Sequence, residues 1–164
     1  MAISADPVSR SSASELAVLR EGVVAGLLGA FVVMVAFGVY DWTQGSLFRT
    51  PSVLNALFFQ NVPPDQVEPR WSLAAGYAVV HGLLWMAAGV AATVLARITE
   101  DFPKLWYVMV VGVTALFCAG VWALGRTEIP GLGYHHLWVG ALLGSGAMIT
   151  YLSWRHPSIV HHLD

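Results

Sequence analysis

The chain has 164 residues, of which 57% are hydrophobic and 11% are charged, and its mean hydropathy is +0.66. A soluble domain averages about 45–50% apolar and about 25% charged residues, so this composition indicates an integral membrane protein. Eight Lys and Arg against ten Asp and Glu give a net charge of -2, which excludes the basic surface that nucleic-acid binding requires. The single cysteine, Cys118, cannot form a disulfide within the chain.

The first segment in chain order, residues 1–18, is hydrophilic and contains three serines between positions 11 and 14. Such a segment has too little apolar content to fold alone, so it is predicted to be a disordered cytoplasmic leader. A four-span transmembrane domain is expected over residues 19–156, followed by a cytoplasmic tail over 157–164. His156, His161 and His162 are expected to be solvated at this end of the chain.

Four windows of the chain lack Asp, Glu, Lys and Arg over about 20 residues, the length that a helix needs to cross a hydrocarbon core of ~30 Å. They are residues 22–40, 72–96, 105–125 and 134–154. Glu21 and Asp41 flank the first window, and we interpret them as charges that mark the two membrane interfaces. The predicted fold class is an all-α integral membrane four-helix bundle.

The positively charged residues are distributed unequally between the two predicted sides. One side carries Arg10, Arg20, Arg97, Lys104 and Arg155, and the other carries Arg49, Arg70 and Arg126. Because Lys and Arg are more frequent in cytoplasmic loops, both termini are predicted to be cytoplasmic.

The first outer loop is predicted to contain a short interfacial helix over residues 51–60. Thr50 can act as its N-cap, and Pro51 would occupy the first helical position, where a missing N–H costs nothing. Val53, Leu54, Leu57 and Phe58 would share one apolar face. Such a helix would lie in the interface or fold back over the bundle, as a lid, a docking surface or a hydrophobic plug.

Small residues repeat at four-residue spacing on two of the predicted spans. They are Gly22, Gly26 and Ala30 on the first span, and Gly140 and Gly144 on the fourth. Lipid supplies no hydrophobic drive between helices, so close approach at small residues contributes much of their association. These faces are predicted to serve helix packing within the bundle, with a homodimer interface as the alternative.

His81 is the one ionisable side chain inside the second span, close to the predicted midplane. An ionisable residue inside a span is a functional-site hypothesis by default. Tyr77 and Trp85 lie one turn to either side on the same face. The functional interpretation is a contact with haem b or a quinone, or a proton relay. The structural interpretation is a neutral imidazole that is hydrogen-bonded within the bundle.

His135 and His136 begin the fourth span, on the same predicted side as Asp41 and Glu128. Adjacent residues on a helix point about 100° apart, so both imidazoles cannot readily face one ion. A metal site here and an interfacial polar cluster are the two interpretations. The depth of this pair differs from that of His81 by roughly 10 Å, which argues against a haem held by two histidines of one chain.

The stretch Glu21-Gly22-Val23-Val24-Ala25-Gly26-Leu27-Leu28-Gly29-Ala30, with Phe48-Arg49-Thr50-Pro51 and the short apolar helix after it, resembles a group of small bacterial four-helix integral membrane proteins with no assigned function. The resemblance covers under half of the chain. It implies the four-helix fold and a bacterial plasma membrane, and it implies no activity.

The chain carries no nucleotide-binding, zinc-protease, haem-attachment or serine-hydrolase motif, so it is predicted not to be an enzyme and no cofactor is predicted outright. The leading hypothesis is an accessory or structural subunit that packs in the lipid bilayer against other subunits of a respiratory or photosynthetic complex. One alternative is an electron-transfer anchor in which His81 binds haem b or a quinone. Another is a small oligomeric channel.

Overall fold

The computed structural model of the chain describes residues 7–102, 104–125 and 134–157. Its elements in chain order are α1 (Pro7–Thr43), α2 (Arg49–Asn55), the π-helical turn η1 (Ala56–Gln60), the 3₁₀ turn η2 (Pro64–Gln66), α3 (Trp71–Asp101), α4 (Leu105–Gly125) and α5 (Tyr134–Arg155). The described residues include no strand. The all-α fold class is confirmed.

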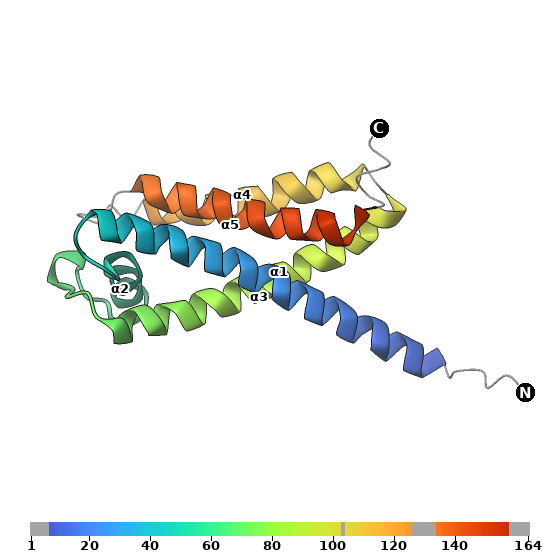
Figure 1. Cartoon of the computed structure of the whole chain (residues 1–164), viewed down its shortest axis with the longest axis horizontal. Helices are drawn as coiled ribbons and strands as arrows, with labels where there is room; N and C mark the ends of the chain where they lie inside the picture. Colours follow the sequence, from blue (N-terminus) through green and yellow to red (C-terminus); the bar gives the residue numbers. More distant parts are fainter. Residues whose placement is uncertain (1–6, 103, 126–133, 158–164) are drawn as a thin grey trace, which may run out of the picture.

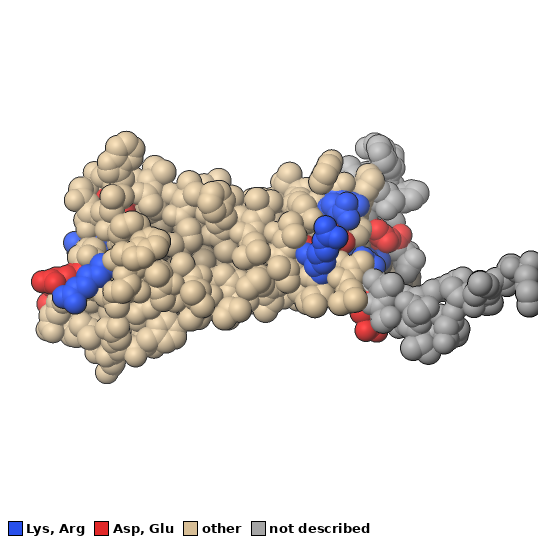
Figure 2. Space-filling view, turned by 60° about the horizontal axis from the view of Figure 1, so that its bottom comes forward, with Lys and Arg blue, Asp and Glu red and all other residues tan. Residues whose placement is uncertain are grey.

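Four of these helices are long and apolar enough to cross a membrane: α1, α3, α4 and α5. Charged side chains gather at the two ends of the molecule, and the zone between them is uncharged (Figure 2). This distribution matches a hydrocarbon belt between two polar interfaces. The chain is a multi-pass membrane protein, and its four spans lie where the charge-free windows predict them.

The N-terminal segment differs from the prediction. The expected disordered leader, residues 1–18, is helical from Pro7 onward, and this part of α1 extends beyond the other helices (Figure 1). Proline is well tolerated as the first residue of a helix. Each residue added to an existing helix gains a hydrogen bond without a new nucleation cost. The helix that begins within the bundle therefore continues through the N-terminal residues of α1 that lie outside it.

The four long helices alternate in direction, with α1 packed against both α3 and α5 (Figure 1). Helix α4 packs against α5 and, less extensively, against α3. The α4 span is also the least buried, with 11% of its window inside the structure, compared with 39% for the spans in α1 and α5. The bundle thus has a tight side around α1 and a more open side between α3 and α4.

Glycines allow α1 and α3 to approach backbone to backbone. A Cβ atom on Gly26 would overlap the carbonyl oxygen of Trp85 and lie 2.6 Å from the Cα of Met86. A Cβ atom on Gly89 of α3 would in turn overlap the carbonyl oxygen of Gly22 and lie 2.8 Å from the Cα of Gly26. Even a methyl group has no space at this crossing.

The glycines at the crossing of α1 with α5 make space for an indole ring. Gly29 and Gly144 both lie against Trp85, and a Cβ atom on Gly144 would lie 2.7 Å from Cη2 of that ring. Trp85 is 3% exposed and occupies the middle of the bundle. Gly140 lies against Phe37, whose Cε1 would be 3.0 Å from an added Cβ atom. The small-residue faces thus lie inside this chain's own bundle.

Helix α2 begins differently from the prediction. Its N-cap is Phe48, with a φ of 67°, and Thr50 lies inside the helix. The backbone N–H of Thr50 donates to Oδ2 of Asp41 at 2.8 Å, and its hydroxyl donates to Oδ1 at 2.6 Å. A carboxyl group from the end of α1 therefore satisfies a free N–H at the start of α2, so Thr50 is not needed as the cap.

Helix α2 folds back over the bundle, and its residues from Thr50 to Asn55 are buried. The hydroxyl of Ser52 is 3.2 Å from both the N and the O of Arg70, just before α3. Asn55 packs against Gly76 of α3. The predicted apolar face is thus directed into the protein over much of its length, although Phe58 is 53% exposed.

Candidate functional site

Three ring side chains of α3 form a ladder along one face of the helix, as their four-residue spacing predicts. The hydroxyl of Tyr77 is 3.2 Å from Nδ1 of His81, and the two rings stack with centroids 5.1 Å apart. The centroid of Trp85 lies 5.9 Å from that of His81. A hydroxyl and an imidazole are therefore held in fixed orientation inside an apolar span.

A fourth ring, from α4, completes this ladder. Phe117 stacks on Trp85 with ring centroids 3.9 Å apart and ring planes 10° apart. The sequence does not predict Phe117 as part of this site, because an apolar residue in an apolar span carries no signal of the face that it presents. Together, Tyr77, His81, Trp85 and Phe117 are called the ring ladder below.

The ring ladder lines an apolar cavity of about 670 Å³. The cavity lies in the half of the bundle that α2 and η1 cover, between these segments and the spans. Its other walls include Phe37 of α1, Leu54 of α2, Phe58 and Phe59 of η1, Gly120 of α4 and Leu137 of α5. This volume is within the range of about 300–1,000 Å³ that is typical of small-molecule sites.

One buried polar atom of this cavity's wall has no partner. Nε2 of His81 is inaccessible to solvent and forms no hydrogen bond within the described part of the chain. When the Tyr77 hydroxyl donates to Nδ1, the neutral imidazole carries its proton on Nε2 and can donate it. A buried unpaired donor is costly, and a ligand with a carbonyl oxygen would satisfy it once the side chains that cover Nε2 move aside.

The π-helical turn η1 contributes two adjacent aromatic side chains, Phe58 and Phe59, to the cavity. A π-helical turn is rare and frequently occurs at functional sites. Phe58 and Phe59 of the predicted interfacial helix thus form part of a cover over the cavity. The predicted lid and the predicted plug are both compatible with this position.

The cover is fixed by a polar cluster where α1 ends and α5 begins. We call it the outer cluster, after the side that the charge pattern predicts to be outer: Asp41, Thr50, His136 and Tyr40. Asp41 is 1% exposed and binds Thr50 through both carboxyl oxygens. Nε2 of His136 is 3.2 Å from the Thr50 hydroxyl, and its ring stacks on Tyr40 at 3.9 Å. Four polar and aromatic groups therefore hold the start of α2 against two spans.

The two histidines predicted as metal ligands are not brought to one site. His136 is buried in the outer cluster, whereas His135 is exposed. Glu128, the other candidate ligand beside Asp41, lies outside the described residues. Among the residues that the structure describes, no group of three or more His, Cys, Asp or Glu side chains could hold a metal ion. The metal site gains no support from this arrangement.

A second polar cluster, which we call the inner cluster, lies at the opposite end of the bundle and joins α1 to the ends of α3 and α5. The carboxylate of Glu21 lies 3.6 Å from Arg97, 3.6 Å from Arg155 and 3.0 Å from Nε2 of His156. Nδ1 of His156 lies 2.5 Å from Glu100. The expectation that His156 is solvated is wrong: it is 6% exposed, because two carboxylates from neighbouring helices face its ring.

Replacing Glu21 with glutamine is expected to destabilise the bundle. Removing one partner of a buried ion pair costs about 3–5 kcal/mol. The partial exposure of Arg97 and Arg155 reduces the expected loss in the free energy of unfolding to roughly 2 kcal/mol. Titration with sodium dodecyl sulfate in mixed micelles would measure it. The control is Glu68→Gln, which removes an exposed pair with Arg70; equal losses in the two variants would contradict this role of Glu21.

Comparisons with protein families, with curated proteins and with solved structures find no match to this chain. The assignment of a function therefore depends on the two polar clusters, the ring ladder and the cavity.

Proposed function

We propose that this multi-pass membrane protein binds a neutral, ring-bearing lipid of the quinone class in the cavity lined by the ring ladder. The observation that carries the proposal is the unpaired Nε2 of His81, a buried polar atom in the wall of an apolar cavity of about 670 Å³. A quinone ring offers flat faces to aromatic side chains and a carbonyl oxygen to a hydrogen-bond donor. The protein would hold this ligand without acting on it chemically.

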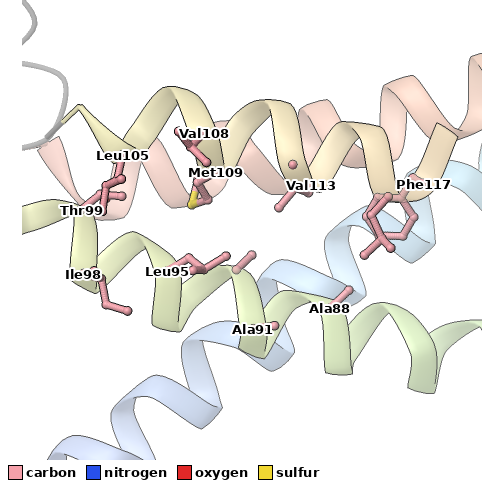
Figure 3. Close-up of a pocket in the computed structure, with 13 residues that line it drawn as sticks. Ala88, Ala91, Leu95, Ile98, Thr99, Leu105, Val108, Met109, Val113 and Phe117 are labelled. Carbon is pink, nitrogen blue, oxygen red and sulfur yellow. The ribbon is translucent and has the colours of Figure 1, made fainter. Parts of the chain in front are cut away.

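An apolar tail would have a continuous path from this cavity. A second apolar cavity, of about 350 Å³, lies between α3 and α4, and Leu116 and Phe117 line both cavities. Figure 3 shows Leu95 of α3 and Met109 and Val113 of α4 between the two helices, with Phe117 at one end of the cavity and Thr99 and Leu105 at the other. A long isoprenoid-type tail therefore fits the open side of the bundle better than a compact ligand does.

Haem b fits this cavity less well than a neutral ring does. The described lining residues include one histidine, His81, and no methionine or cysteine that could be a second axial ligand. They also include no Lys or Arg to neutralise the two haem propionates. A charged group without a partner in an apolar site is costly. These two properties favour a neutral ligand.

The proposal is tested by titrating the purified protein with a short-tailed benzoquinone and measuring the quenching of tryptophan fluorescence. His81→Leu removes the one hydrogen bond and is expected to weaken binding about tenfold. The control His135→Leu changes an exposed histidine and should leave binding unchanged. No saturable quenching in the unmodified protein, or equal affinities in all three proteins, would contradict the proposal.

A second candidate function is that of an accessory subunit in a larger membrane complex, such as a respiratory or photosynthetic one. The observation in its favour is the slight burial of α4, whose Tyr107, Val108, Val111 and Leu116 are each more than half exposed. Such a face can pack against lipid or against another subunit. A quinone-binding subunit of this kind would unite both candidates. An oligomeric channel remains a prediction with no observation in its favour.

The proposed location is a bacterial inner membrane with both termini in the cytoplasm. The excess of Lys and Arg on the side of the termini supports this orientation, and the resemblance to small bacterial membrane proteins supports the membrane. The inner cluster would then lie at the cytoplasmic interface, and the cover over the cavity at the outer one.

A further inference from the structure

Beside the inner cluster lies a pocket that the quinone-class proposal does not use. It has a volume of about 420 Å³ and lies at the surface where the ends of α3 and α5 meet α1. Its lining includes Arg20 and Glu21 of α1, Arg97 of α3, and Tyr151, Trp154 and Arg155 of α5. Basic side chains are visible at this end of the molecule in Figure 2. Three helices thus contribute one arginine each.

The pocket has a surplus of positive charge. Three arginines line it, and Glu21 is the one carboxylate among the lining residues. That carboxylate is already shared by Arg97, Arg155 and His156. Arg20 forms no ion pair within the part of the chain that the structure describes. A further anion would therefore meet unneutralised guanidinium groups.

An unpaired donor in the pocket wall also points to an absent acceptor. Nε of Arg97 is buried and has no hydrogen-bond partner among the described residues. Arginine presents a planar set of donors that matches the oxygens of a phosphate. A phosphate group in the pocket would supply acceptors for the accessible guanidinium nitrogens of Arg20, Arg97 and Arg155.

The aromatic and apolar residues of the pocket are of the kind found where lipid headgroups meet acyl chains. Trp154 is 74% exposed, and Trp and Tyr are enriched at this level of the membrane. Val24 and Tyr151 line the pocket toward the membrane interior. Basic pockets between spans on the cytoplasmic side are typical binding sites of anionic lipid headgroups.

We propose that this pocket binds the phosphate of an anionic phospholipid, with Arg20, Arg97 and Arg155 as its ligands and Trp154 against the start of the acyl chains. The occupant is a lipid of the surrounding bilayer, because the pocket opens at the membrane interface and a lipid diffusing in that plane reaches it directly. The site is independent of the cavity lined by the ring ladder, so either proposal can fail without the other.

The test is a lipid titration of the delipidated protein in detergent, followed by native mass spectrometry. Phosphatidylglycerol is expected to bind about 25-fold more tightly than phosphatidylcholine with the same acyl chains, because Glu21 offsets one of the three arginines and two fivefold gains remain. Each arginine near the surface contributes about a fivefold gain in affinity for anionic lipid. Arg20→Gln should therefore weaken phosphatidylglycerol binding about fivefold. Arg20 lies outside the ion pairs of Glu21, so this variant leaves the inner cluster intact.

The control is Arg70→Gln, which removes the same charge at the opposite end of the molecule and should change the affinity less than twofold. A third arm adds inorganic phosphate in large excess, which should not displace the lipid. The proposal is overturned if phosphatidylcholine binds as tightly as phosphatidylglycerol, or if Arg20→Gln and Arg70→Gln behave alike. Displacement by inorganic phosphate would also overturn it, because the site would then bind free anions.

Discussion

Replacing Gly26 with alanine is expected to lower the free energy of unfolding by about 2–3 kcal/mol. The added Cβ atom would overlap the carbonyl oxygen of Trp85 and would lie 2.6 Å from the Cα of Met86. Both are backbone atoms of α3, so the clash cannot be relieved by a side-chain rotation and α1 must move away. Overpacking of a well-packed site costs about 1–3 kcal/mol, and the gain in helix propensity of up to ~1 kcal/mol offsets only part of it.

The matched control is Gly38→Ala in the same helix. A Cβ atom on Gly38 would meet nothing within 4 Å, so this variant should be as stable as the unmodified protein or slightly more stable. Unfolding by sodium dodecyl sulfate in mixed micelles measures both variants under the same conditions. If Gly26→Ala is no less stable than Gly38→Ala, then α1 and α3 do not cross at these glycines.

Replacing Asp41 with alanine is expected to release the cover and to cost about 3 kcal/mol in the free energy of unfolding. The change removes two hydrogen bonds to Thr50, at 2.8 and 2.6 Å. It leaves the backbone N–H of Thr50 buried without an acceptor. A hydrogen bond to a charged group contributes about 1.5–3 kcal/mol, and a buried unsatisfied donor adds its desolvation cost.

Hydrogen–deuterium exchange measures this release locally. In Asp41→Ala, the amides of α2 should exchange faster, while those in the middle of α1 should change little. The control Asp65→Ala changes an exposed aspartate of the same loop and should leave the exchange of α2 unchanged. Equal exchange of α2 in the two variants would show that Asp41 does not hold the cover.

The spans could be predicted from the sequence because charge-free length is a property of the chain alone. The limits of α4, Leu105–Gly125, agree with the predicted window. The helices α1 and α3 extend beyond their windows. In α3, Arg97 and Glu100 remain helical while their side chains pair across the bundle. A composition window ends at the first charge, whereas a helix ends where its backbone loses hydrogen bonds.

The two polar clusters could not be predicted in the same way. The charge pattern predicts that Glu21 and Asp41 mark the interfaces, but both are buried. Glu21 lies against side chains of α3 and of the end of α5, and Asp41 binds Thr50 nine residues further along the chain. His156 follows the last predicted span, which predicts a solvated side chain, but it is buried against Glu21 and Glu100. Which residues meet across the bundle depends on the rotation of each helix about its axis, and the spacing of charges does not specify this rotation.

The candidate site could be predicted in part. The four-residue spacing of Tyr77, His81 and Trp85 places them on one face of α3, and an ionisable residue within a span indicates a site. The sequence does not reveal the contribution of Phe117 or the cavity beside the ladder. The cavity is lined by residues from α1, α2, η1, α3, α4 and α5, and the sequence of each helix does not specify how far it lies from the others.

The most direct measurement for the central claim is native mass spectrometry of the protein extracted gently from its own membrane. The account predicts one bound molecule per chain with the mass of a quinone-class lipid. In Gly120→Leu, a side chain would fill the cavity from a position where a Cβ atom meets nothing within 4 Å, and the bound molecule should be lost. Gly146→Leu, equally unobstructed but outside the cavity lining, should retain it. An empty unmodified protein, or equal retention in both variants, would contradict the account.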